Sequence, residues 1–125
     1  MAEEVVKSSL LAGELEGAAQ LCLASAAMTS DDRFPPGSGE YVRREHHARK
    51  RRFEHAKSLI ESGVTDVLEL GLSHDDLGWA ASRAHLARDK EGWRARFQKA
   101  ELELRERFQQ QLEQLKSEEP EPVQI

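Results

Sequence analysis

Histidines and paired carboxylates are the side chains of this sequence best suited to hold a metal ion or move a proton. His46 and His47 are adjacent, so on a helix they point about 100° apart, and His55 lies further along the chain. A helical zinc site needs ligands four residues apart together with a third ligand nearby. The histidine spacing does not meet that requirement, so we predict no metal site and interpret these residues as surface histidines.

Adjacent carboxylates occur at Asp31/Asp32 and at Asp75/Asp76. Such pairs are common in turns and at the first turn of a helix, where they accept backbone hydrogen bonds. No arrangement of nucleophile, base and orienting group accompanies them. We therefore predict no catalytic residue and no cofactor-binding residue, and we expect the protein not to be an enzyme.

The single cysteine and the lack of long apolar segments bear on where the protein works. Cys22 has no second cysteine to pair with and lies in an apolar run, which is typical of a core residue in a reducing compartment. That run, residues 18–28, is much shorter than the roughly 20 residues needed to span a membrane. We expect a cytoplasmic protein without a membrane partner.

Positive charge is concentrated in one stretch of a chain whose formal net charge is −5. Between residues 43 and 57 the sequence has seven basic and two acidic side chains, a local charge of +5, so the remainder carries −10. Apolar residues recur at helical spacing through the same stretch, which predicts an amphipathic helix over residues 41–62. The basic residues are Arg43, Arg44, Arg49, Lys50, Arg51, Arg52 and Lys57.

Three interpretations of this basic helix stay open. Its arginines could neutralise phosphates of a nucleic acid, they could bind an acidic protein partner, or they could be solvated and paired within the chain. Pairs spaced by four residues are available at Glu40/Arg44, Glu45/Arg49, Lys50/Glu54 and Lys57/Glu61. The residues least well accounted for, and hence our candidates for binding a partner or nucleic acid, are Arg43, Arg51 and Arg52, together with Arg44.

A narrow apolar stripe runs along the C-terminal part of the sequence and predicts a long helix that ends near residue 116. This helix is longer than a compact bundle of this size requires, so its far end should overhang. The stripe could be covered by the rest of the chain, or it could form a short coiled coil with a second copy. Our self-association candidates are Leu104, Phe108, Leu112 and Leu115.

The remaining patterns predict helices over residues 3–28 and 74–88, with a short segment at 65–70. Ser73 and Asp76 have the spacing of a capping box at the start of the second of these helices. Gly63 and Gly71 are expected to end the elements that precede them. Whether residues 74–116 form one kinked helix or two stays open. Residues 29–40 are expected to form a loop.

These elements predict an all-α fold, a small bundle of three to four main helices with a long C-terminal helix and a short disordered acidic tail. We expect one helical domain over residues 1–117 and the tail over residues 118–125. The charge segregation and the apolar stripe favour a non-enzymatic interaction protein, an adaptor or regulator that binds another protein and self-associates. The alternative is a nucleic-acid-binding regulator that uses residues 41–62.

Overall fold

The computed structural model describes residues 7–29 and 38–118, and within them the chain is all-α. Most of the predicted acidic tail at residues 118–125 and of the predicted loop at residues 29–40 lies outside this part. Within it, residues 38–40 of the predicted loop belong to a helix, and so does Glu118 of the predicted tail. In chain order the elements are α1 (Ala12–Met28), α2 (Ser38–Glu61), η2 (Val67–Leu70), α3 (His74–Ala81), η3 (Ala84–Leu86) and α4 (Lys90–Glu118).

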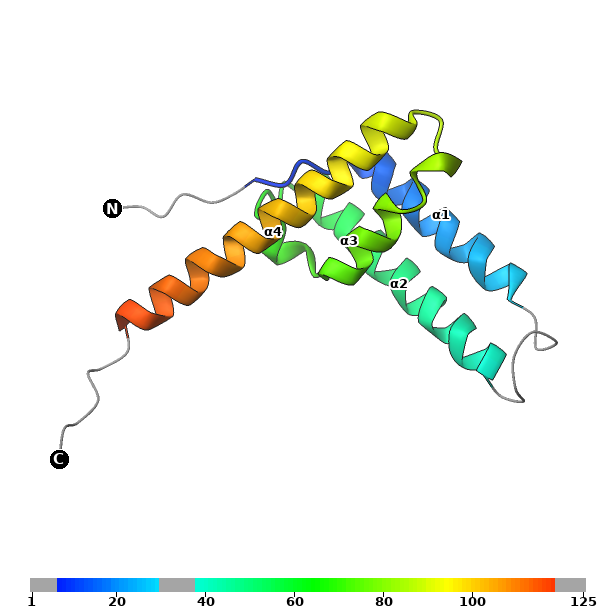
Figure 1. Cartoon of the computed structure of the whole chain (residues 1–125), viewed down its shortest axis with the longest axis horizontal. Coiled ribbons are helices and arrows are strands. Elements are labelled where there is room, and N and C mark those ends of the chain that lie inside the picture. The colour runs from blue at the N-terminus through cyan, green and yellow to red at the C-terminus, as the bar shows by residue number, and fades with distance from the viewer. Residues whose placement is uncertain (1–6, 30–37, 119–125) are drawn as a thin grey trace.

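Helices α1 and α2 form an antiparallel hairpin, and α4 crosses one end of it (Figure 1). The predicted start of the first helix at residue 3 is wrong for residues 7–11, because this segment is extended and α1 begins only at Ala12. The Ser8 amide donates to the Thr65 carbonyl at 2.8 Å, and Lys7 forms an isolated bridge with Asp66. These pairings use backbone groups that a helix would need, so the chain segment after α2 fixes where α1 starts.

The region at residues 74–116 forms two helices, and the predicted helix over residues 74–88 ends early, at Ala81. The Trp79 carbonyl accepts hydrogen bonds from Ser82 Oγ at 2.8 Å and from Arg83 Nη1 at 3.1 Å. These side-chain donors satisfy a carbonyl at the end of α3. The next helix has its own start, since the carboxylate of Asp89 accepts from the Gly92 amide at 3.1 Å as an N-cap.

The core lies where the hairpin meets α3 and α4. Phe53 of α2 packs edge-to-face on Phe97 of α4, with ring centroids 6.3 Å apart. The Trp93 indole donates to the Ala80 carbonyl at 2.8 Å, which ties α4 to α3. Cys22 is fully buried, as the sequence predicted. The largest fully buried hydrophobic side chains are Phe53, Phe97, Leu15, Leu70, Leu77, Leu104, Val67 and Cys22.

Two glycines end the elements that precede them, as predicted. Gly63 follows α2 with φ of 103°, and Gly71 follows η2 with φ of 74°. Both values lie in the left-handed region, which glycine enters without a steric penalty. The capping box is also present, with Ser73 Oγ accepting from the Asp76 amide at 3.1 Å. Asp76 of this box also pairs with Arg49 and Arg52 of α2.

Candidate functional site: the extension of α4 and the basic helix

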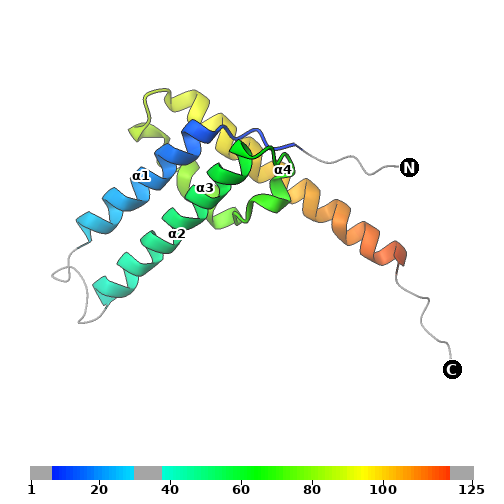
Figure 2. The same cartoon turned by 180° about the vertical axis from the view of Figure 1, so that it is seen from behind.

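Helix α4 leaves the body of the protein after Arg107. Leu104 is 2% exposed, and Arg107 Nε donates to Asp66 Oδ2 at 3.1 Å, with both side chains largely buried. From residue 108 to residue 116 no side chain is buried against the part of the chain that the structure describes. The two opposite views show this end of α4 projecting away from the other helices (Figures 1 and 2). We call residues 108–116 the α4 extension.

The apolar stripe of α4 continues along this extension without cover. Phe108, Leu112 and Leu115 are 43%, 53% and 54% exposed. Their spacing of four and three residues keeps them on the side of the helix that carries Leu104. Leu104 itself is fully packed in the core, so our prediction that it is available for self-association is wrong. Its position falls within the body, where η2 and the residues before α1 cover α4.

The edges of this stripe carry almost no net charge. Glutamine occupies positions 109, 110, 111 and 114, and the charges of Glu113 and Lys116 cancel. Gln109 Nε2 donates to Glu113 Oε1 at 3.3 Å on the surface of the helix. The His74 ring lies 6.2 Å from the Phe108 ring and marks the last ring contact between the body and the stripe among the described residues. An exposed apolar stripe without repelling charge is suited to contact another helix.

On the basic helix, the expectation that Arg52 lacks a partner is wrong. Arg52 Nε donates to Asp76 Oδ2 and Arg52 Nη2 donates to Asp76 Oδ1, both at 2.8 Å. This is a two-point guanidinium–carboxylate pair, the strongest type of ionic hydrogen bonding in proteins. The partner comes from α3, 24 residues along the chain. Spacing rules within one helix cannot find such a pair.

Asp76 receives a second guanidinium as well, because Arg49 Nε donates to its Oδ1 at 3.0 Å. Arg49 therefore pairs with Asp76 rather than with Glu45, the partner expected from sequence. The Asp76 side chain is fully buried, and burial opposes its ionisation. The hydrogen bonds from Arg52, from the Ser73 backbone and from Arg49 outweigh burial, so the pKa of Asp76 lies below its ordinary value.

The other basic residues of α2 are divided among several faces. Two predicted local pairs are confirmed, Arg44 with Glu40 at 2.8 Å and Lys50 with Glu54 at 3.0 Å. Lys57 instead reaches Glu16 of α1 at 3.1 Å. The structure does not bring the four candidate arginines together. Arg52 is held at α3, Arg43 also has an interaction partner, and Arg44 and Arg51 lie on the outward side.

Two guanidinium groups also lie over the Trp79 ring, a contact that sequence spacing did not reveal. Arg83 lies 4.0 Å and Arg49 lies 5.2 Å from the ring centroid. Burial and the nearby charge of Arg49 lower the pKa of Arg83. His46 packs against the same ring at 6.2 Å, and burial followed by the charge of Arg49 lowers its pKa too. The basic side chains that face inward from α2 thus build the packing against α3.

Comparisons of this chain with protein-family models, with curated proteins and with solved structures returned no match. Within residues 7–29 and 38–118, no group of three or more His, Cys, Asp or Glu side chains could hold a metal ion. None of the helices in that same part of the chain is long and apolar enough to cross a membrane. The candidate surfaces therefore rest on the geometry alone.

Proposed function

We propose that this protein is a non-enzymatic interaction module, an adaptor or regulator that self-associates and binds other proteins through the α4 extension. The observation that carries this proposal is the uncovered stripe of Phe108, Leu112 and Leu115 on a helix that projects beyond the body. Exposed apolar stripes of this kind typically mark sites of protein contact. A cytoplasmic location is part of the proposal.

A second copy of the chain is the partner that this surface fits most simply. Two extensions that run antiparallel would cover each other, with Phe108 of each protomer opposite Leu115 of its partner. The extension carries one acidic and one basic side chain, Glu113 and Lys116, so it has no net charge with which to repel a second copy. The contact would be about 14 Å long, so it would bury less than a standard interface, and we expect a dissociation constant of roughly tens to hundreds of micromolar.

Disulfide cross-linking tests this arrangement. In an antiparallel pair the midpoint between positions 108 and 115 falls next to Leu112, so a Leu112→Cys variant should form a covalent dimer on mild oxidation. Leu102→Cys is the matched control, because Leu102 is as exposed as Leu115 but precedes the α4 extension and lies about 120° round the helix from Phe108. The native thiol does not interfere, since Cys22 is buried and burial raises its pKa to about 11.

We expect the Leu112→Cys protein to cross-link at least about ten times faster than the Leu102→Cys protein at equal concentration. The physical reason is that transient pairing of the extensions raises the local thiol concentration only at position 112. Equal rates for the two variants would show that cross-linking follows random collisions. That result would contradict the proposed surface.

Nucleic-acid binding remains a second candidate function, supported by the outward side of α2. Arg51 is exposed and forms no hydrogen bond or ion pair with any residue of the described part, and Arg44 lies two turns away on the same side. If this row binds phosphates, labelled DNA or RNA should be retained with an affinity that falls steeply as salt rises, and Arg51→Glu should abolish it while Arg51→Lys should not. If no DNA or RNA is retained even at low salt, nucleic-acid binding is excluded as a function.

A further inference from the structure

Three side chains that can carry positive charge contact the Trp79 ring of α3. Arg83 lies 4.0 Å and Arg49 lies 5.2 Å from the ring centroid, and the centroid of the His46 ring lies 6.2 Å from it. Arg49 has a carboxylate partner in Asp76, whereas Arg83 donates to the Trp79 carbonyl and has no carboxylate partner in the described part of the chain. Two permanent positive charges therefore lie beside an imidazole that can gain a third.

The His46 imidazole is half-buried, although the sequence predicted a surface histidine. Its Nδ1 atom is buried and has no hydrogen-bond partner among the described residues. A neutral imidazole carries a proton on only one nitrogen, so Nδ1 can be the nitrogen without one. An imidazolium carries a proton on both nitrogens, and Nδ1 would then be a buried donor without an acceptor. The surroundings of the ring therefore favour its neutral form.

Charged neighbours on α2 favour the neutral form as well. Residues three or four positions away on a helix lie on the same face, and the charged residues at these distances from His46 are all basic: Arg43, Arg49 and Lys50. The adjacent His47 also opposes protonation, whereas the charge of Glu45 favours it. Burial contributes most, followed by the charges of Arg49, Arg83 and His47, and together they lower the pKa of His46.

The elements packed against this part of α2 supply no free carboxylate. Residues 17–28 of α1 contain no charged side chain. The carboxylate of Asp76 on α3 already accepts hydrogen bonds from Arg49 and Arg52. Arg83, which follows α3, adds a further positive charge. A proton gained by His46 is therefore not compensated within its own surroundings.

We propose that His46 is a pH-sensitive switch, which covers the Trp79 ring when the imidazole is neutral and uncovers that ring when the imidazole is protonated. Protonation moves the charged imidazolium off the indole and into water, away from Arg49 and Arg83. Trp79 already lines a groove on α3 together with these two arginines. Loss of the His46 ring enlarges the exposed part of the indole, so acid uncovers an aromatic surface beside two guanidinium groups.

The rest of the packing is expected to survive in the same pH range. Asp76 stays ionised while His46 gains its proton, because the pKa of Asp76 lies below the ordinary carboxyl value. The Trp93 indole still donates to the Ala80 carbonyl and holds the end of α3 on α4. Because the folded-state pKa of His46 lies below its unfolded-state value, the His46–Trp79 contact stabilises the fold fully above the unfolded-state pKa. Its contribution is lost as the pH falls through the folded-state pKa.

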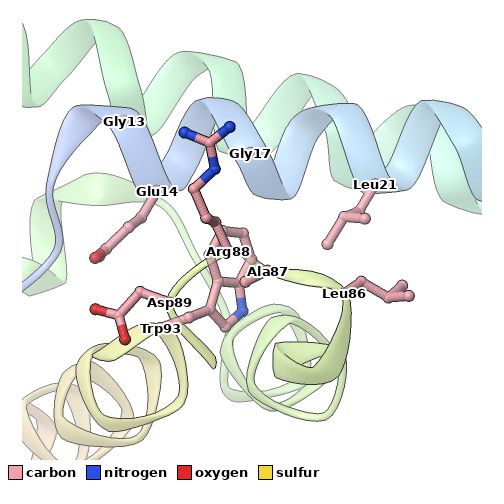
Figure 3. A pocket seen from close by; sticks show the side chains of 9 residues that line it. All are labelled: Gly13, Glu14, Gly17, Leu21, Leu86, Ala87, Arg88, Asp89 and Trp93. Carbon is pink, nitrogen blue, oxygen red and sulfur yellow. The ribbon is translucent and has the colours of Figure 1, made fainter. Parts of the chain in front are cut away.

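The two tryptophans allow a test by NMR, because each gives its own indole signals. Trp93 is the internal control, since it lines a different groove, where its ring packs on Gly17 of α1 (Figure 3). Between about pH 7.5 and 4.5 the Trp79 signals should shift together with the ring signals of His46, and a neutral gadolinium chelate should relax Trp79 faster in acid. The Trp93 signals should stay in place. The Leu112→Gln, Leu115→Gln protein is used, so that self-association does not enter the measurement.

Single variants identify the group that titrates. His46→Gln should abolish the Trp79 transition, because glutamine does not titrate, whereas His47→Gln, at the exposed neighbouring position, should keep it. Two charge variants test the cause of the shift. Arg83→Gln should move the midpoint to higher pH because a repelling cation is lost, and Glu45→Gln should move it to lower pH because a favourable carboxylate is lost.

The two charge variants keep the test decisive even if His46→Gln does not fold, since both retain His46. Circular dichroism at neutral pH confirms that each variant is folded. The proposal is overturned if the Trp79 and Trp93 signals change together, because acid then acts on the whole fold. It is also overturned if the Trp79 transition persists in folded His46→Gln, or if Arg83→Gln and Glu45→Gln move the midpoint in the same direction.

Discussion

A single side chain, Asp76, joins α2 to α3 and also starts α3. It accepts hydrogen bonds from Arg49, Arg52 and the Ser73 amide. Its place in the capping box was predictable from sequence, because that motif has a fixed local spacing. Its ion pairs were not, because they join residues 24 and 27 positions apart. Arg52, which had no partner at local spacing in the sequence, is therefore a structural residue.

Replacing Asp76 by asparagine should destabilise the fold. Asparagine can still accept from the Ser73 amide, but two guanidinium groups then lose the carboxylate between them. We expect the free energy of unfolding to fall by roughly 3 kcal/mol, the lower part of the range for a broken buried pair, because Arg52 is partly hydrated. Urea denaturation measures the change. The control is Asp75→Asn, an exposed neighbour in the same first turn, which should cost no more than about 1 kcal/mol.

The stability of the protein should also depend on the charge of Asp76 in acid. Because the folded-state pKa of Asp76 is lower than that of the unfolded chain, its stabilising contribution is fully present above the unfolded-state pKa. The contribution is lost as the pH falls from there through the lower folded-state pKa. Thermal unfolding across this range should show a shallower acid decline for Asp76→Asn than for wild type. Equal slopes would contradict the pairing described here.

Helix boundaries that depend on residues close in sequence were predictable, whereas boundaries that depend on tertiary contacts were not. The helix stops at Gly63 and Gly71 and the start of α3 at Ser73 follow from residues close in sequence. The start of α1 depends on a pairing with residues 65–66, and the early end of α3 depends on side-chain donors that cap it. Apolar spacing continues through both positions, so periodicity alone extended both helices too far.

The α4 stripe also has a boundary that tertiary contacts set. Sequence predicted one apolar stripe from Trp93 to Leu115, and it predicted an overhang. Where the body ends depends on which residues cover α4, and the boundary lies at Arg107 and its bond to Asp66. Leu104 and Phe108 are one turn apart and look alike in sequence, yet one is 2% exposed and the other 43%. The candidate surface was therefore predicted, but its boundary was not.

Substitutions on either side of this boundary should differ sharply. Leu104→Ala should lower the free energy of unfolding by about 2–5 kcal/mol, because it leaves a cavity in the core. Leu112→Gln combined with Leu115→Gln should change it by less than about 0.5 kcal/mol when the protein is dilute enough to be monomeric. Urea denaturation at low micromolar concentration makes the comparison. A large loss for the double variant would mean that the body covers these leucines.

The described part of the molecule consists of a body whose helices are joined by ion pairs and of the projecting α4 extension. Three of the seven basic residues that first suggested a nucleic-acid surface, Arg49, Arg52 and Lys57, join α2 to α3 or α1. The projecting end differs, because it carries an exposed apolar stripe and no net charge. We therefore place the proposed association on the α4 extension and not on the basic helix.

The most direct test is the molar mass of the protein in solution as a function of concentration, measured by sedimentation equilibrium. Between about 5 and 500 μM the average mass of wild type should rise from 14.1 kDa toward twice that value, since the expected interface is small. The Leu112→Gln, Leu115→Gln double variant should remain at 14.1 kDa, while Leu102→Gln should behave like wild type. A wild-type protein that remains monomeric at every concentration would contradict self-association through the α4 extension.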